Sequence, residues 1–342
     1  MARRKSTNKV TLADVAKRAG VSSMTASRVI NREARVSAET RQRVEQVIQD
    51  LNYEPNIAAQ NLAGGKIRRI CLLYDNPSSA YLGELLLGAL EAASEAGAHL
   101  IVERTSPDLN AEELEQRLSR DWDGLIVPPP MSDIAGIRKL VAKHRFPAAF
   151  ISSATLPGRA NEVRIDDRAA AFEMTQYLTS KGHKRIGFIK GNPNQTVSEE
   201  RLIGHQEAIR SAGLAPDSEL VVQGDFTYRS GEAAAAELLR LTSKPTAIFA
   251  SNDDMAAGAL AAAARCGLSV PTDLSIVGFD NSPIASTVWP KLTTMEQPLA
   301  KLAARSVAIA LNTEPGRDED FETLILKHRI IERDSVQSPA EK

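Results

Sequence analysis

The 342-residue sequence has only two cysteines, few aromatic residues and no long apolar run. Cys71 and Cys266 lie far apart within apolar stretches, so we expect both in the core and no disulfide framework. No stretch approaches the ~20 apolar residues that cross a bilayer. The basic start, Arg3 to Lys5, is not followed by the apolar segment of an export signal. These absences predict a cytoplasmic protein without membrane segments.

Motifs for catalysis and cofactor binding are also missing. The five histidines show no metal-ligand spacing, and there is no GxSxG, GxxxxGK[ST] or strand-borne GxGxxG motif. The acidic pairs Asp166-Asp167 and Asp253-Asp254 stand where helices are expected to begin, a position typical of helix caps. The sequence therefore favours a binding protein over an enzyme, with neither metal nor cofactor.

The net charge of −1 conceals an uneven distribution of charge along the chain. Residues 1–69 contain 14 basic and 6 acidic side chains, whereas the remainder contains 28 and 37. A basic N-terminal part on an acidic body indicates a polyanion partner for that part alone. The length predicts two or three domains rather than one small core.

Residues 11–31 predict two short helices joined by a turn. Thr11 is placed to cap the first helix, Asp14 suits its positive end, and Gly20 permits the left-handed backbone that ends it. The second helix begins after Ser22 and leaves these side chains facing outward: Ser23, Met24, Ser27, Arg28 and Asn31. Such a pair suits insertion into a DNA major groove, although an ordinary solvated helical hairpin shows a similar pattern.

A third helix is expected from Ser37, as its cap, to about Leu51, followed by a break that ends at Pro55. Residues 56–63 are helix-prone and end at Gly64-Gly65. Isolated helices shorter than ~12 residues are marginal in water. We therefore expect this octet to be helical only against a partner.

From Ile67 onward, strands alternate with helices, and the alternation restarts after Asp166. The strands are rich in Val, Ile and Leu without strict polar alternation, which predicts parallel sheets covered on both faces. The restart indicates two similar lobes. The last part predicts an extended segment, an amphipathic helix over residues 299–312 and two further strands, which would fit a chain crossing back between lobes.

Several stretches, in order, closely resemble the lactose/galactose repressor family of bacterial transcription regulators. They are VTLADVAKRAGVSSMTASRVIN, RVSAETRQRV, LNYEPN, AAQNLAGG, ERLIGHQEAI, GDFTYRSG, SNDDMAAGAL, VPTDLSIVGFD and LTTMEQP. The resemblance implies an all-α helix-turn-helix headpiece and hinge helix, followed by a two-lobed α/β core similar to periplasmic sugar-binding proteins. The implied divisions are 1–55 for the DNA-binding domain, 56–66 for the hinge helix and linker, 67–164 with 294–326 for the N-terminal lobe, and 165–293 with 327–342 for the C-terminal lobe.

The same resemblance implies a homodimer that binds pseudo-palindromic operator DNA. The DNA-contact positions it implies are Thr11, Ser22, Ser23, Met24, Thr25, Ser27, Arg28, Asn31, Ser37, Thr40, Tyr53, Asn56, Ala59, Leu62 and Ala63. Arg28 suits guanine, whereas hydroxyl and amide side chains suit phosphates. Leu62 of each subunit would wedge into the central base step from the minor groove. Met24 as a packing residue and Leu62 as plain linker packing are the alternatives.

The resemblance also implies an effector site in the cleft between the lobes. The positions are Asp75, Asn76, Tyr81, Arg201, Phe226, Asn252, Asp253 and Asp280. Flat aromatic faces combined with directional hydrogen-bonding groups suit a sugar or sugar derivative, and a purine or nucleoside is the second choice. Arg201 leaves an acidic sugar open, but it is also able simply to pair with Asp280. Asp253 as a helix cap and Asn252 as a turn residue are further alternatives.

The sequence thus predicts a transcriptional regulator, most simply a repressor of carbohydrate-utilisation genes. Its operator affinity would change when a ligand closes the lobes and alters how two hinge segments meet on DNA. A sugar receptor without DNA binding matches the core equally well. The basic N-terminal part and the missing export signal disfavour that alternative. The polar C-terminus favours a dimer over a coiled-coil tetramer.

Overall fold

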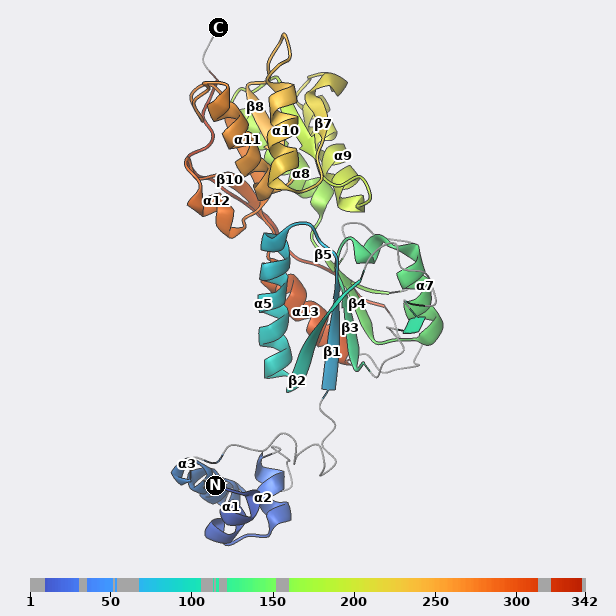
Figure 1. Ribbon diagram of the computed structural model, residues 1–342, viewed down its shortest axis with the longest axis vertical. Helices are drawn as coiled ribbons and strands as arrows, with labels where there is room; N and C mark the ends of the chain where they lie inside the picture. The colour runs from blue at the N-terminus through green and yellow to red at the C-terminus, as the bar shows by residue number, and fades with distance from the viewer. Residues whose placement is uncertain are drawn as a thin grey trace, which may run out of the picture. The chain divides into compact units, whose positions relative to one another are not determined.

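The computed structural model describes residues 10–30, 36–51, 53, 68–105, 113, 115–116, 122–151, 160–312 and 321–339. The chain forms two compact units, Met1–Ile67 and Arg68–Lys342 (Figure 1). We call the first the headpiece and the second the core.

The described residues of the headpiece form three helices around a small apolar centre. They are α1 (Leu12–Ala19), α2 (Ser23–Ile30) and α3 (Ala38–Asp50). Val15, Ala26 and Val44 are completely buried where the three helices meet. These side chains recur at helical spacing, so each helix has one apolar face, and a glycine turn joins the first two helices. The predicted helix-turn-helix is confirmed.

The first lobe of the core is built on a six-stranded parallel sheet in the order β11-β5-β4-β3-β1-β2. Its strands are β1 (Arg68–Tyr74), β2 (Ala98–Arg104), β3 (Gly124–Val127), β4 (Ala148–Ile151), β5 (Asn161–Arg164) and β11 (Thr323–Ile325). On one face, α5 (Ser79–Glu95) and α13 (Leu299–Asn312) pack together against the sheet. The short helix η1 (Met131–Asp133) and α7 (Ala135–His144) cover the other face.

The second lobe repeats this plan with the order β12-β10-β9-β8-β6-β7. Its strands are β6 (Ile186–Lys190), β7 (Val221–Gln223), β8 (Ala247–Ala250), β9 (Ser275–Asp280), β10 (Thr293–Glu296) and β12 (Arg329–Ile331), of which β12 alone runs antiparallel to its neighbour. α10 (Tyr228–Leu238) and α11 (Asp253–Arg265) cover one face, and α8 (Asp167–Ser180) and α9 (Thr196–Ser211) cover the other. The short helices η2 (Ser218–Leu220) and α12 (Pro283–Thr287) lie in loops. The predicted two-lobed α/β core is confirmed.

The strand ladders correct one boundary of the predicted lobes. The sequence assigns residues 294–296 to the first lobe, but β10 pairs with β9 and β12 in the second sheet, so the chain crosses after Glu296. The chain crosses again farther on, because β11 lies in the first sheet and β12 in the second. The first crossing is not visible in the local pattern, because partners in a ladder are distant in sequence.

Cysteine placement is a further correction. Cys71 is buried in β1 as expected, whereas Cys266 is exposed. It stands at the C-terminal end of α11, where the apolar run leaves the core. No helix within the described ranges is long and apolar enough to span a membrane.

Candidate functional site

Capping interactions set the geometry of the headpiece helices. The Thr11 backbone N–H donates to the Asp14 carboxylate at 2.9 Å, and the Asp14 backbone N–H donates to the Thr11 hydroxyl at 3.3 Å. The Thr11 hydroxyl also donates to the Asp14 carboxylate at 2.7 Å, and this bond, with the one from the Thr11 backbone N–H, lowers the pKa of Asp14. Gly20 adopts a φ of 66°, which only glycine takes without strain, and it turns the chain into α2.

The outward face of α2 begins with small polar groups and one flexible apolar residue. Ser22 and Ser23 are exposed, and Met24 is 65% exposed, so the structure does not place Met24 in the headpiece core. Thr25, Ser27 and Arg28 are half-buried. This start of α2 is therefore accessible to a partner, as a recognition helix requires.

Of the other predicted DNA-contact residues, some are described by the structure and some are not. The Ser22 and Ser37 hydroxyls accept backbone N–H groups of Thr25 and Thr40 at 3.1 and 3.4 Å, so both serine residues also cap helices. Tyr53 is half-buried against the headpiece core. Asn31, Asn56, Ala59, Leu62 and Ala63 lie outside the described residues.

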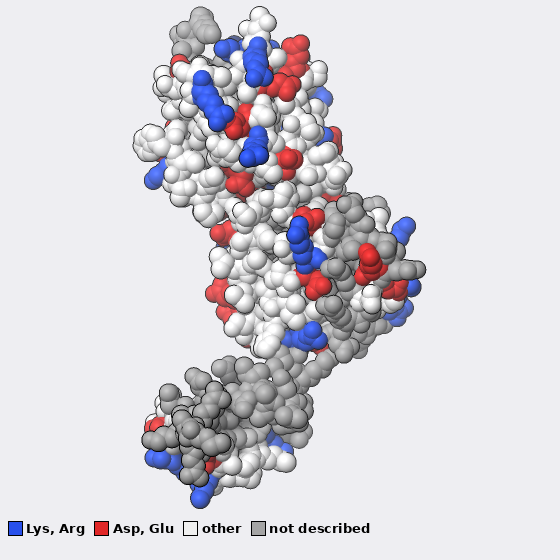
Figure 2. Space-filling model, viewed as in Figure 1, with Lys and Arg blue, Asp and Glu red and all other residues white. Residues whose placement is uncertain are grey.

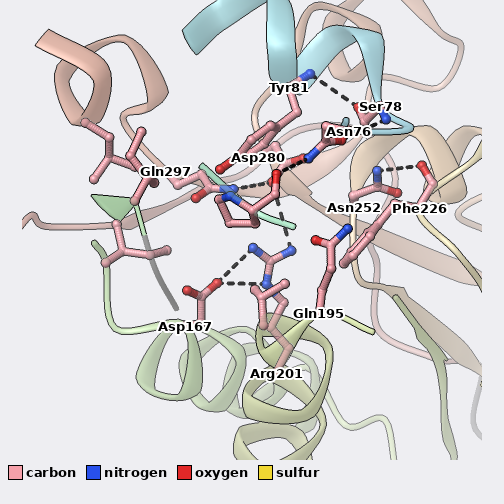
Figure 3. A pocket seen from close by; sticks show the side chains of 15 residues that line it. Asn76, Ser78, Tyr81, Asp167, Gln195, Arg201, Phe226, Asn252, Asp280 and Gln297 are labelled. Atoms are coloured by element: carbon pink, nitrogen blue, oxygen red, sulfur yellow. Dashed lines mark hydrogen bonds and ion pairs between the residues drawn. The ribbon is translucent and has the colours of Figure 1, made fainter. Parts of the chain in front are cut away.

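A pocket lies between the two lobes of the core, with about 500 Å³ of space unfilled by protein atoms and partly open to solvent (Figure 3). Most of its polar lining follows the carboxyl ends of parallel strands, where ligands bind in such folds. The lining residues are Asn76, Ser78, Tyr81, Pro129, Ile151, Ile165, Asp167, Gln195, Val197, Arg201, Phe226, Asn252, Asp280, Gln297 and Leu302.

Arg201, on α9, is the most heavily bonded side chain of the pocket. Its Nε and Nη2 lie 2.9 and 2.8 Å from Oδ1 of Asp167, and Nη1 donates to the Ser251 carbonyl. The guanidinium lies over the Phe279 ring, with Cζ 3.6 Å from the centroid. Arg201 and Asp167 are each nearly completely buried. Burial raises the pKa of Asp167, and the charge of Arg201 opposes that shift.

Asp280 ends β9 with a positive φ of 109°, which turns its side chain into the pocket. Its Oδ1 accepts a hydrogen bond of 2.5 Å from Gln297 and lies 4.0 Å from Nη1 of Arg201. Burial raises the pKa of Asp280 well above its usual range, and the nearby Arg201 charge opposes the shift. Arg201 therefore pairs more closely with Asp167 than with Asp280.

The ring of Phe226 forms one wall of the pocket, and a hydrogen bond to the Phe226 backbone holds it in place. Asn252 donates to the Phe226 carbonyl at 3.0 Å and accepts from the Met255 N–H at 2.9 Å, so it caps α11 while it fixes this loop. A Cβ on Gly191 would lie 2.0 Å from the Phe226 ring, so only glycine leaves room for it.

The first lobe contributes the start of α5 to the pocket. Ser78 caps this helix by accepting from the Tyr81 N–H at 3.2 Å, and its own hydroxyl donates across the cleft to Asp254 at 2.7 Å. The Tyr81 ring faces the pocket (Figure 3), and its hydroxyl makes no hydrogen bond with a described residue. Asn76 donates to the Pro129 carbonyl at 3.1 Å, which ties two strand ends together.

Six of the eight predicted effector residues come together in this pocket: Asn76, Tyr81, Arg201, Phe226, Asn252 and Asp280. Two do not line it. Oδ1 of Asp75 lies 3.9 Å from Nε of Arg104, which is exposed. Asp253 is buried beneath the cleft, where it accepts hydrogen bonds from Ser282 and Thr294, and burial raises its pKa to about 7.

Sequence reasoning missed Ser78, Asp167, Gln195 and Gln297, which all line the pocket. Asp167 follows the end of β5, and Gln297 follows the end of β10. The rule that ligands bind beyond strand ends would have indicated both. Gln195 stands at the N-terminal end of α9 and was not among the residues that the resemblance implies.

Together these side chains offer flat apolar faces, carboxylate acceptors and amide and hydroxyl donors. Such a set can enclose a small polar molecule and orient it through directional hydrogen bonds. No cluster of His, Cys, Asp or Glu suitable for a metal ion occurs in the described part of the chain.

Comparison with known proteins agrees with both halves of this architecture. Residues 11–56 match the family described as bacterial regulatory proteins, lacI family, and residues 175–336 match a periplasmic binding protein-like domain. HTH-type transcriptional regulator DegA of Bacillus subtilis (strain 168) is 34% identical over 332 residues, which cover 96% of this chain and 98% of that protein. Catabolite control protein A of Priestia megaterium is 33% identical over 333 residues, covering 96% and 99%.

Solved structures show the same relationship across nearly the whole chain. The lac repressor dimer bound to operator and the anti-inducer ONPF has a TM-score of 0.75 at 28% identity, covering 96% of this chain and 100% of that one. The transcriptional regulator CelR–cellobiose complex has a TM-score of 0.73 at 29% identity with the same coverage. These relatives are transcriptional regulators rather than enzymes. The chain belongs to the LacI family of bacterial regulatory proteins.

Proposed function

We propose that this protein is a sequence-specific repressor of carbohydrate-utilisation genes whose operator affinity changes when a sugar-like effector binds between the core lobes. The observation that carries the proposal is a polar, aromatic-walled pocket between two lobes, on a chain that also contains a helix-turn-helix headpiece. The likeness to a regulator solved with cellobiose supports a sugar over other small ligands.

On DNA, α2 enters the major groove, and Arg28 reads a guanine. The hydroxyl-bearing residues at the helix starts contact phosphates, as Ser22 and Ser37 stand where helix N-termini attract anions. The hinge over residues 56–66 orders when two copies meet, with Leu62 wedged into the central base step and Ala59 and Ala63 at the groove walls. This wedge requires a dimer on a pseudo-palindromic site.

An exposed apolar face in the first lobe supports the homodimer. Leu87 and Leu90 on α5 are 63% and 57% exposed, and Val102 on the edge strand β2 is 41% exposed. Figure 2 shows that the surface over α5 is largely uncharged. Contiguous exposed apolar side chains mark interaction surfaces, and a two-fold interface uses the same patch on both subunits.

Effector binding acts through the same lobe. A ligand that joins the two lobes changes how the first lobes of a dimer are placed, and hence whether the hinge segments can meet on DNA. Allosteric coupling of this kind is typically ~1–3 kcal/mol, or roughly a 5- to 150-fold change in operator affinity.

A gel shift tests the DNA-binding part. We expect the intact protein to bind the DNA upstream of its own gene much more tightly than random DNA at ~150 mM salt, where non-specific binding is weakened. Arg28→Ala should weaken specific binding by ~1–3 kcal/mol. Arg43→Ala, an exposed position on α3, is the matched control. Equal binding to upstream and random DNA would refute the proposal.

A further inference from the structure

The pocket arginine is already engaged within the protein, with contacts from each of its three guanidinium nitrogens. Nε and Nη2 of Arg201 are bonded to Asp167, Nη1 donates to the Ser251 carbonyl, and Phe279 lies against one face. Only 4% of the residue is exposed. A carboxylate or phosphate that paired with the Nε–Nη2 edge would have to displace Asp167, which leaves a buried charge unpaired.

The charges that line the pocket also oppose an anion. Arg201 is the single cation among the lining residues, against the two carboxylates of Asp167 and Asp280. Both carboxylates are at least nine-tenths buried, where charges are poorly screened by solvent. A negatively charged ligand would enter an enclosed space whose one cationic lining residue is already paired with Asp167.

The Gln195 amide is a buried polar group of the pocket without a partner. Gln195 is 4% exposed, and its Nε2 makes no hydrogen bond with any residue that the structure describes. Figure 3 shows this amide beside the Phe226 ring, on the same side of the pocket as Arg201. A buried donor without an acceptor is unfavourable, so a ligand that supplies an acceptor gains from it.

We propose that the effector is an uncharged molecule, and that Gln195 determines its specificity by donating a hydrogen bond to a ligand oxygen or ring nitrogen beside the Phe226 face. Uronates and sugar phosphates are rejected, because Arg201 is already neutralised within the protein. This inference rests on the proposed effector site. It excludes an acidic sugar as the effector, an alternative that the sequence left open.

Matched ligands test the charge rule on the full-length protein. Thermal shift followed by calorimetry would compare glucose with glucuronate and glucose 6-phosphate, galactose with galacturonate and galactose 6-phosphate, cellobiose with cellobiose 6′-phosphate, and adenosine with adenosine 5′-monophosphate. We expect at least one uncharged member to bind, and its anionic counterpart to bind at least about 10-fold more weakly. An anion that binds as tightly as its neutral counterpart, or a panel in which no uncharged member binds, overturns the proposal.

Two substitutions test the residues. Gln195→Leu keeps the volume but removes the donor, so it should weaken the neutral ligand by roughly 10- to 100-fold without lowering the Tm of the ligand-free protein. Gln176→Leu, at an exposed position on α8, is the control and should leave affinity unchanged. Unaltered affinity in Gln195→Leu contradicts the assignment.

Asp167→Asn gives the opposite prediction, a gain of binding. It removes the charge that neutralises Arg201, so the affinity for the anionic counterpart should rise at least about 10-fold relative to the neutral ligand. An unchanged ratio counts against the charge rule. If Asp167→Asn does not fold, the matched ligands and Gln195→Leu still decide the question. Operator binding in the gel shift needs no effector, so failure of the DNA-binding proposal remains distinguishable from failure of this one.

Discussion

Asp133 of the first lobe caps a helix of the second lobe, and removing it should open the cleft. The Thr196 backbone N–H and hydroxyl donate to the two oxygens of Asp133 at 3.2 and 2.9 Å. Thr196 begins α9, and the residue at its own N-cap position, Gln195, makes no side-chain capping bond. The helix that carries Arg201 thus receives its cap across the cleft.

The expected effect of Asp133→Ala follows from these two hydrogen bonds. A hydrogen bond to a charged group contributes about 1.5–3 kcal/mol, and loss of a helix cap costs about 0.5–2 kcal/mol. Burial raises the pKa of Asp133, and the bonds from Thr196 oppose the shift, so the carboxylate loses some of this gain to desolvation. We therefore expect the closed arrangement to lose roughly 2–3 kcal/mol, which shifts the equilibrium toward the open arrangement about 30- to 150-fold.

Spin-label distances between lobes measure this shift directly. Labels at exposed Glu91 and Glu237, in a Cys266→Ser background and diluted with unlabelled subunits, report one subunit at a time. The unsubstituted protein should give a narrow distribution, and Asp133→Ala a longer, broader one. Asp334→Ala removes an exposed carboxylate with no hydrogen bond to the described residues and is the control. Identical distributions in all three proteins would refute the reasoning.

Three further predictions concern stability. Asp253→Asn should flatten the pH dependence of the free energy of unfolding. Burial raises the pKa of Asp253 to about 7, so the folded state keeps a proton that the unfolded state loses above about pH 4. In the unsubstituted protein this group should therefore lower the free energy of unfolding by about 4 kcal/mol between pH 4 and pH 7. Urea denaturation at pH 5 and 8 checks this, and equal pH slopes in both proteins would contradict it. Gly204→Ala places a Cβ 2.1 Å from the Arg168 carbonyl oxygen, between α8 and α9, and should destabilise the protein by about 1–3 kcal/mol in thermal denaturation. In the control, Gly83→Ala, the new Cβ meets no atom within 4 Å and should not destabilise the protein. Ser37→Ala removes the cap of α3 and should lower headpiece stability by about 1 kcal/mol in circular dichroism melts; an unchanged melt would show that the cap contributes nothing.

Local chemistry made much of this fold predictable. The capping pair Thr11 and Asp14, the turn at Gly20 and the apolar strands each follow from neighbouring residues. Six of the effector positions that the resemblance implies line one pocket. These features depend on short-range propensity and on motifs whose spacing is preserved in the chain.

What could not be predicted depends on contacts between distant residues. The lobe crossing was misplaced because the pairing of β10 with β9 and β12 is not visible in its own four residues. Adjacent residues also diverge. Asn76 enters the pocket and Asp75 does not, and Asn252 lines it while Asp253 is buried beneath it. The pairing of Arg201 with Asp167 spans 34 positions, so it too required the folded chain.

The most direct test of the account is the operator affinity of the intact protein, measured at ~150 mM salt with and without a saturating uncharged ligand from the matched panel. We predict binding to the upstream site at least about 10³-fold tighter than to random DNA, and a 5- to 150-fold change in that affinity when the ligand is present. An operator affinity that stays the same at full ligand occupancy would contradict the proposed link between the pocket and DNA.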